Sequence, residues 1–152
     1  MSDLRSIDVP VTSQVDSDSA LSEPIGDARL SKPTTIEATA TVAVALDVLR
    51  RDPNGAVVVV DGARVTGIFT ERDVLKSVAG RPEALSRPLT EFMTHDPVVL
   101  REDDSMAVAL NKMGAGGFRH IPLLRDGKLV ALVTANDVMS WVMDRFFAQT
   151  NG

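Results

Sequence analysis

Cysteine and tyrosine are absent from this chain of 152 residues, and tryptophan occurs once. Because there is no cysteine, the chain has no disulfide, no thiolate nucleophile and no thiolate metal site, and it suits a reducing compartment. Aromatic residues make up only 4% of the chain, too few for the stacking platforms that bind single-stranded nucleic acid. A net charge of −5 without a basic stripe excludes a general attraction to nucleic acid or anionic lipid.

Long apolar runs are also missing. The longest uninterrupted run, Ala56 to Val60, is far too short to cross a bilayer, and the first residues lack the apolar segment of a signal peptide. We therefore expect a soluble, cytoplasmic protein with no nucleic-acid or membrane partner. The apolar content of 44% suffices for one compact module or for two small repeats that share a core.

An internal duplication organises the sequence. The stretch GIFTERD at 67–73 recurs 64 residues later as ALVTAND at 131–137, and both copies join an apolar run to Thr-x-x-Asp. The same offset relates Pro33 to Pro97 without a gap. Such a repeat predicts a fold built from two copies of one unit, each too small to cover its own apolar strands.

Each unit is predicted to run in the order β-α-β-β-α. In the first unit we expect strands at 34–36, 56–60 and 65–69, a helix from Thr39 or Thr41 to Arg51, and a helix from Glu71 to Ala79. In the second unit we expect strands at 98–100, 118–124 and 129–133, a helix from Ser105 to the glycines at 114–117, and a helix from Ala135 to about Ala148. Asp103 or Asp104 is the predicted cap of the helix at Ser105.

The predicted organisation is a mobile polar leader at 1–23, a first repeat at 24–80, a linker at 81–87, a second repeat at 88–148 and a tail at 149–152. Within the leader, Ile7, Val9 and Val11 alternate with other residues and can form an edge strand. Whether the leader docks on the repeats is left open by the sequence.

The Thr-x-x-Asp motif has two interpretations. A Thr at the N-cap and an Asp in the first turn satisfy free backbone N–H groups and the positive end of the helix dipole. The same hydroxyl and carboxylate, at a corner between strand and helix, also point toward one opening, beside backbone N–H groups at the helix start that suit a phosphate. The vicinal hydroxyls of a ribose would fit there.

Two tandem β-α-β-β-α units that each close with an apolar strand, Thr-x-x-Asp and a helix resemble a pair of cystathionine-β-synthase (CBS) domains, the Bateman module. The resemblance covers about residues 24–141, and its most specific stretches are 67–75 and 119–122. It implies an α/β (α+β) fold whose repeats pack sheet to sheet with pseudo-twofold symmetry. It also implies adenosine-type ligands, namely AMP, ADP, ATP, NAD or S-adenosylmethionine, in two clefts between the repeats.

The resemblance further implies ligand contacts. Asp73 and Asp137 would take the ribose hydroxyls in one cleft each, with Thr70 and Thr134 beside the ribose or phosphate. The implied apolar and backbone contacts are Val57, Val58, Ile121, Pro122, Thr35 and Val99. The implied phosphate contacts are Arg119 and His120 in the second copy and Arg72 in the first.

The copies differ at these positions. Gly55 and Ala56 stand where the second copy has Arg119 and His120, so we expect the first copy to lack those phosphate donors. Ala131 stands where the family usually has Gly, and its methyl group is expected to narrow the second cleft.

Nothing in the sequence resembles a catalytic motif or a metal site. Acidic pairs such as Glu71 with Asp73, or Asp103 with Asp104, are explained by helix starts, and His95 and His120 lack ligand spacing. We therefore expect no enzyme and no required cofactor. The expected function is a stand-alone regulatory module that senses an adenine nucleotide as its regulatory ligand and signals by a change in shape or partner affinity.

Two alternatives remain open: a structural or interaction module with degenerate clefts, and an enzyme acting on a nucleotide. The final helix carries more apolar side chains than one face can bury, which predicts a homodimer through helices that include Trp141 and Phe146. A leader folded over that helix is the alternative. An unidentified protein target is also left open.

Overall fold

The structure is a computed structural model that describes residues 20–151, with side chains up to Phe147. The edge strand expected at 7–11 lies outside the described residues, and so does most of the leader whose docking the sequence left open. Among the described helices, none is long and apolar enough to cross a membrane.

Two mixed sheets form the centre of the molecule. The first has the order β1 (Thr35–Glu37), β2 (Ala56–Asp61), β3 (Arg64–Thr70) and β4 (Thr94–His95), and the second has the order β5 (Leu100–Arg101), β6 (His120–Arg125) and β7 (Lys128–Thr134). In each sheet the first strand is parallel to the second, and the second forms an antiparallel hairpin with the third. The predicted α/β fold of two repeats is confirmed.

The two hairpins have the same register. Ala56 pairs with Thr70 as His120 pairs with Thr134, and each hairpin has one irregularity, after Val59 in the first and after Leu123 in the second. The offset of 64 residues therefore holds in space as well as in sequence through this part of the two repeats.

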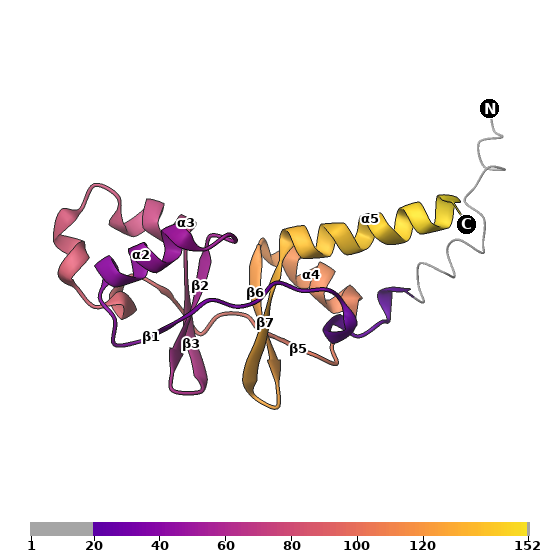
Figure 1. Cartoon of the computed structure of the whole chain (residues 1–152), viewed down its shortest axis with the longest axis horizontal. Helices are drawn as coiled ribbons and strands as arrows, with labels where there is room; N and C mark the ends of the chain where they lie inside the picture. The colour runs from indigo at the N-terminus through magenta and orange to yellow at the C-terminus, as the bar shows by residue number, and fades with distance from the viewer. Residues whose placement is uncertain (1–19, 152) are drawn as a thin grey trace.

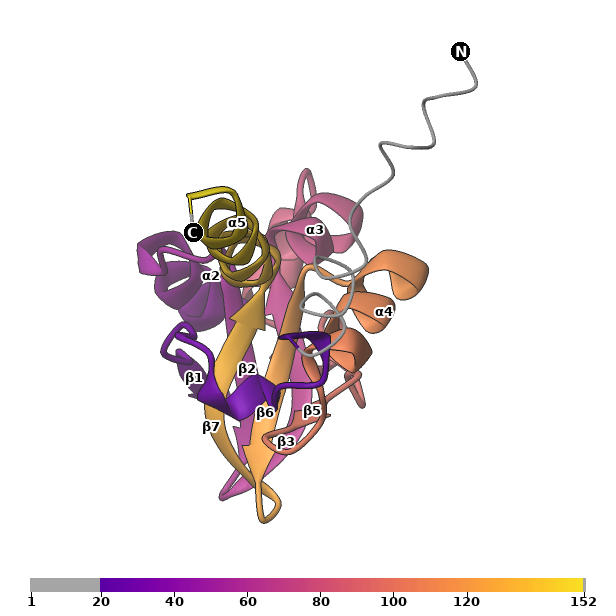
Figure 2. The ribbon, with the colours of Figure 1, turned by 90° about the vertical axis from the view of Figure 1, so that its right-hand side faces the viewer.

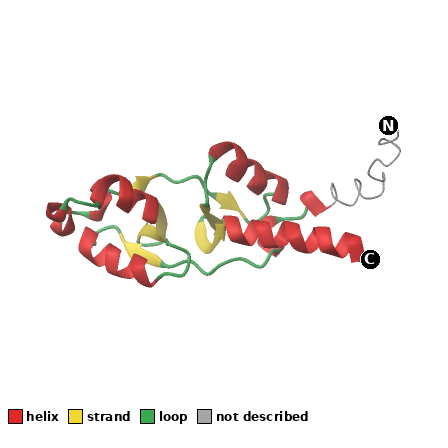
Figure 3. Ribbon diagram, turned by 90° about the horizontal axis from the view of Figure 1, so that it is seen from above, coloured by secondary structure: helices red, strands yellow, loops and turns green. Residues whose placement is uncertain are grey.

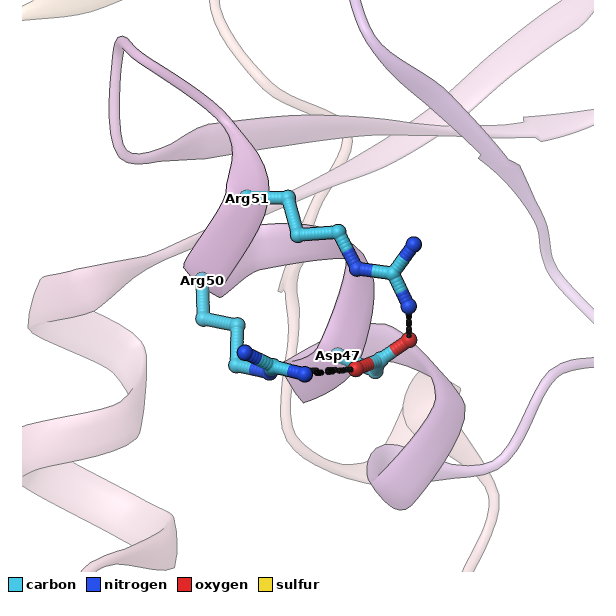
Figure 4. Close-up of polar contacts among 3 residues, drawn as sticks. All are labelled: Asp47, Arg50 and Arg51. Carbon is cyan, nitrogen blue, oxygen red and sulfur yellow. Dashed lines mark hydrogen bonds and ion pairs between the residues drawn. The ribbon is translucent and has the colours of Figure 1, made fainter.

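The helix α2 (Val42–Arg51) begins at the second of its two predicted caps, since the Thr41 side chain accepts a hydrogen bond from the Val44 N–H. Val42, Ala45 and Leu49 form its buried face, as their spacing predicts. On its exposed face Asp47 forms ion pairs with Arg50 and Arg51 (Figure 4). Pairs this exposed contribute little to stability.

The cap predicted for the helix α4 (Met106–Gly116) is wrong. The Ser105 hydroxyl, and not Asp103 or Asp104, accepts from the Val108 N–H, at 3.3 Å. The Asp104 carboxylate accepts from the Arg101 N–H instead, closing the turn before the helix. At its other end α4 stops at Gly117, whose φ of 72° is the left-handed conformation expected for the glycine run.

Three further segments differ from the prediction. The helix expected at 71–79 is one α-helical turn, α3 (Glu71–Asp73), followed by the π-helical segment η3 (Val74–Val78). The linker contains a 3₁₀ turn, η4 (Pro82–Ser86). The last helix, α5 (Ala135–Asn151), runs beyond the expected end at Ala148.

Figure 1 shows the β2–β3 and β6–β7 hairpins side by side, with α2 and α3 on one side and α4 and α5 on the other. Seen from above, the strands lie between these helix groups (Figure 3). The apolar layer between the sheets consists of Ala56, Val58, Val60, Ile68 and Leu132. The helices gather at one end of the strands, opposite the hairpin turns (Figure 2). The strand-to-helix corners are at the helical end.

The start of each repeat crosses to the other repeat. Ile25, fully buried, belongs to the second repeat's core, and its N–H donates to the Asp104 carbonyl at 2.7 Å. Leu89, also fully buried, belongs to the first repeat's core, and its N–H donates to the Ala40 carbonyl at 3.0 Å. These crossing segments, residues 24–32 and 88–96, make each core depend on both halves of the chain.

We predict that Gly67→Ala lowers the free energy of unfolding by about 1–3 kcal/mol, because the added methyl group would lie 2.5 Å from Met93 Sδ and 2.9 Å from the Thr94 carbonyl oxygen. Urea denaturation measures the change. Gly114→Ala is the matched control, since its methyl group meets no atom within 4 Å and alanine favours the helix. If Gly67→Ala and the parent unfold at the same urea concentration, segment 88–96 does not pack closely against β3 at Gly67, which would contradict the structure.

Candidate functional site

Both Thr-x-x-Asp motifs form capping boxes. Asp73 N–H donates to Thr70 Oγ1 at 3.3 Å, and Thr70 N–H donates to Asp73 Oδ2 at 2.9 Å. Asp137 N–H donates to Thr134 Oγ1 at 3.0 Å, and Thr134 N–H donates to Asp137 Oδ2 at 3.1 Å. The structural interpretation of the motif is therefore confirmed at both corners. It leaves part of each carboxylate available to a further donor.

That further donor comes from the crossing segment of the other repeat. Thr94 Oγ1 donates to Asp73 Oδ1 at 3.0 Å, and Ser31 Oγ donates to Asp137 Oδ2 at 2.8 Å. Ser31 N–H adds a bond to the same Asp137 oxygen, at 3.2 Å. Each carboxylate thus joins the two repeats.

Ser31 and Thr94 are 63 residues apart, so the gapless offset of 64 fails in the crossing segments. Thr94 pairs with Ile68 and Ser31 with Leu132, which places the two hydroxyls at equivalent positions. Asp96, with φ of 44°, lies between this position and Pro97 and takes up the additional residue.

A cleft of about 640 Å³ opens beside Asp73. The predicted residues that line it are Thr70, Arg72, Asp73, Arg119 and His120. Residues from both repeats therefore meet in one cleft. The remaining lining residues, which the sequence analysis did not single out for ligand binding, are Gly55, Ile68, Glu71, Lys76, Thr94, Gly117 and Phe118.

Arg119 and His120 were expected beside Asp137, in the second copy's own cleft, and the structure places them beside Asp73 instead. The reason is the packing of the repeats, which sets the start of β6 against the turn before β2. His120 Nε2 lies 2.8 Å from the Asn54 carbonyl oxygen of that turn, and because a carbonyl can only accept, the nitrogen is the donor. His120 thus links the repeats.

The cations of the cleft have no ion-pair partner among the described residues. Arg72, Lys76 and Arg119 are exposed and form no ion pair with any described residue. They are free to meet an anion that enters the cleft.

Several predicted contacts lie elsewhere. Val57, Val58 and Ile121 are each 0% exposed and belong to the hydrophobic clusters, so they present no surface to a ligand. Pro122 is buried in β6, Thr35 is exposed on β1, and Val99 is half-buried and accepts a hydrogen bond from Lys112 Nζ through its carbonyl. The strand segments chosen by resemblance are mainly core here.

The sequence analysis missed Lys76 and Phe118. Lys76 lies within the helix expected at 71–79 and Phe118 within the strand expected at 118–124, and neither position belongs to the motif. The expected packing of the repeats sheet to sheet did not by itself show that Phe118 would lie beside the motif of the first copy, where the structure places it. Among the residues described, no three His, Cys, Asp or Glu side chains are grouped to hold a metal ion.

We predict that Ser31→Ala lowers the free energy of unfolding by about 1–2 kcal/mol, because it removes the hydroxyl that bonds the half-buried Asp137 carboxylate across the repeats. Chemical denaturation gives the value. Ser140→Ala, at an exposed position of α5, serves as the control and is expected to change stability by less than about 0.5 kcal/mol. A Ser31→Ala variant as stable as the control would show that this contact does not hold the repeats together.

The comparisons with known proteins agree with this architecture. The sequence profile of the CBS domain matches residues 25–80 and 89–144. An uncharacterised 17.7 kDa protein of Acidianus ambivalens is 33% identical over 116 residues, which cover 75% of this chain and 70% of that protein. The CBS domain-containing protein CBSCBSPB2 of Arabidopsis thaliana is 33% identical over 127 residues, but the chain spans only 23% of its length.

Solved structures show the same fold. The CBS-domain protein ATU1752 of Agrobacterium tumefaciens matches with a TM-score of 0.66 at 31% identity, covering 72% of this chain and 89% of that chain. The structure of CBSX2 in complex with AMP matches with a TM-score of 0.69 at 20% identity, covering 80% of this chain and 97% of that chain. The CBS profile matches two consecutive segments, and the fold matches that of a solved CBS-domain protein. The chain therefore belongs to the CBS domain family and contains a tandem CBS domain pair.

Proposed function

We propose that this CBS pair is a regulatory module, without catalytic activity of its own, that binds an adenosine-type ligand in the cleft at Asp73. The observation that carries the proposal is that, in one cleft of about 640 Å³, a carboxylate from the first repeat meets a guanidinium from the second that forms no ion pair with a described residue. Cavities that hold small molecules range from about 300 to 1,000 Å³. Such a cleft has room for a nucleotide.

Each part of a nucleotide has a partner in this cleft. The Asp73 carboxylate is the acceptor for the ribose hydroxyls, which would replace or share the bond that Thr94 now donates. Arg119 and Arg72 supply charged donors for phosphate. The apolar surfaces of Ile68 and Phe118 suit the base. AMP in the structure of CBSX2, a protein of the same fold, supports this ligand class.

Signalling follows from the position of the cleft. Because its lining comes from both repeats, a ligand that contacts Asp73 and Arg119 together stabilises one arrangement of the repeats over others. The ligand then binds one arrangement with a more favourable free energy than the others. This difference in binding free energy is what would alter the affinity for a partner. The regulated partner is a protein outside this chain.

The competing hypothesis is an interaction module whose clefts bind nothing, in which the Thr and Asp residues only cap helices. The two capping boxes fit it equally well. It gives no reason, however, for three cations that form no ion pair with a described residue and gather in a cleft with two carboxylates, in a chain of net charge −5.

We also propose that two copies associate through α5. Met139, Met143, Phe146 and Phe147 on this helix are each at least 41% exposed, and such a cluster is typical of an interface. Trp141, expected at the same interface, is half-buried instead and packs on the second repeat's core, with the Arg145 guanidinium 4.9 Å from its ring centre. Phe146 is therefore the better probe of association.

Sedimentation velocity tests the dimer. The parent chain is expected to sediment as a dimer and Phe146→Glu as a folded monomer, because a charge at the centre of an apolar interface is not solvated there. Leu75→Glu, which alters an even more exposed apolar side chain on η3, is expected to leave the dimer intact. A monomeric parent that associates only after the residues before Glu23 are removed would contradict this proposal.

Calorimetric titration with AMP and ATP tests ligand binding. We expect Asp73→Asn, which keeps the size of the capping side chain but loses its charge, to weaken binding at least tenfold, or about 1.4 kcal/mol. Asp126→Asn in the exposed β6–β7 turn is the control and should bind as the parent does. Heat changes absent with both nucleotides, or equal affinity in Asp73→Asn and the parent, would contradict the proposed function.

A further inference from the structure

Among the described residues, nine cationic side chains form no ion pair: three line the Asp73 cleft, and the other six are Arg29, Lys32, Arg64, Arg101, Lys112 and Lys128. Six arginines form ion pairs with neighbouring carboxylates: Arg50, Arg51, Arg81, Arg87, Arg125 and Arg145. The cations that line the Asp73 cleft, Arg72, Lys76 and Arg119, have no such partner in the described part of the chain. The free cations of the cleft are therefore not explained by surface ion pairing.

The acidic groups of the cleft do not cancel these cations. Its carboxylates are Asp73 and Glu71, against three cationic side chains. Asp73 already accepts hydrogen bonds on both oxygens, from Thr70 and Thr94. The cleft thus keeps an excess of one positive charge with His120 neutral, in a chain whose net charge is −5.

The corresponding corner of the second repeat lacks these cations. The offset of 64, which the matching strand registers confirm in this region, replaces Arg72 by Asn136 and Lys76 by Ser140. It also places Gly55 at the position of Arg119. The basic residues nearest to Ser31 in sequence are Arg29 and Lys32.

An arginine at position 55 would also be strained by the backbone conformation and would displace the Glu71 side chain. Gly55 has a φ of 69°, and a Cβ atom there would lie 2.8 Å from Glu71 Oε1. In the second repeat the equivalent of Glu71 is Ala135, a side chain short enough to leave space beside Arg119, whose carbonyl accepts from the Ala135 N–H at 2.9 Å. The two corners therefore differ at two positions that contact each other: Gly55 and Glu71 in the first repeat correspond to Arg119 and Ala135 in the second.

A second local difference accompanies Lys76. It lies on the π-helical segment η3, whereas its equivalent Ser140 lies in the regular helix α5. π-helical turns inserted in helices are frequent at functional sites. Lys76 lines the cleft from this turn.

We infer that the two Thr-x-x-Asp corners differ in the ligand they accept: the cleft at Asp73 takes a phosphate-bearing nucleotide, and the corner at Asp137 does not, so that each chain binds one nucleotide. The inference rests on the proposed function and narrows its ligand class. Arg119, Arg72 and Lys76 are the residues that set the specificity, through charge-assisted contacts with phosphate. S-Adenosylmethionine, which carries a sulfonium cation, is disfavoured by the same three charges.

Calorimetry on the full chain with AMP, ATP, adenosine and S-adenosylmethionine tests the inference. We expect one nucleotide per chain, with AMP and ATP binding at least tenfold more tightly than adenosine or S-adenosylmethionine. Arg119→Ala and Lys76→Ala are expected to weaken AMP or ATP at least fivefold each while leaving the weak affinity for adenosine unchanged. Raising the salt concentration should weaken the nucleotides alone.

Arg64→Ala and Lys128→Ala remove exposed cations from the two hairpin turns and serve as matched controls that keep the parent's affinities. Two nucleotides per chain, or adenosine as tight as AMP, would overturn the inference while leaving the proposed function intact. Binding of none of the four ligands would instead overturn the proposed function, and this inference with it.

Discussion

The packing of one repeat's sheet on the other is the interaction on which the rest of the structure depends. Val58, Ile68 and Leu132 form part of the apolar layer between the sheets, and the crossing segments carry Ile25 and Leu89 into the core of the opposite repeat. Each repeat is too small to bury its strands alone, so exchange of these segments completes both cores. The same packing brings the start of β6 beside the corner at Asp73 and thereby creates the cleft.

In the proposed function, the corner residues would serve stability and ligand binding with the same atoms. In the structure the Asp73 carboxylate accepts from Thr70 and from the Thr94 hydroxyl, so the site is satisfied without a ligand. A ribose must therefore replace or share a bond that already joins the two repeats. Such a competition would couple occupancy of the cleft to the contact between the repeats, which is the physical basis of the sensing role that we propose.

The sequence predicted what depends on local pattern and on duplication. Hydrophobic spacing located α2, the β-branched run located β2, and the repeated motif located both capping boxes. Features set by packing between distant segments were not predictable in this way. The clearest example is Arg119, assigned by its place in the chain to Asp137 but brought by the fold to Asp73. Val57 was chosen as a ligand contact, although complete burial gives it a core role.

A crystal structure of the chain with AMP tests the central claim most directly, because it shows which corner holds the nucleotide and which repeats contact it. The account predicts the ribose hydroxyls within about 3.2 Å of the Asp73 carboxylate and the phosphate on Arg119, across the two repeats. Nucleotide bound at Asp137 instead, or contacts confined to a single repeat, would contradict it.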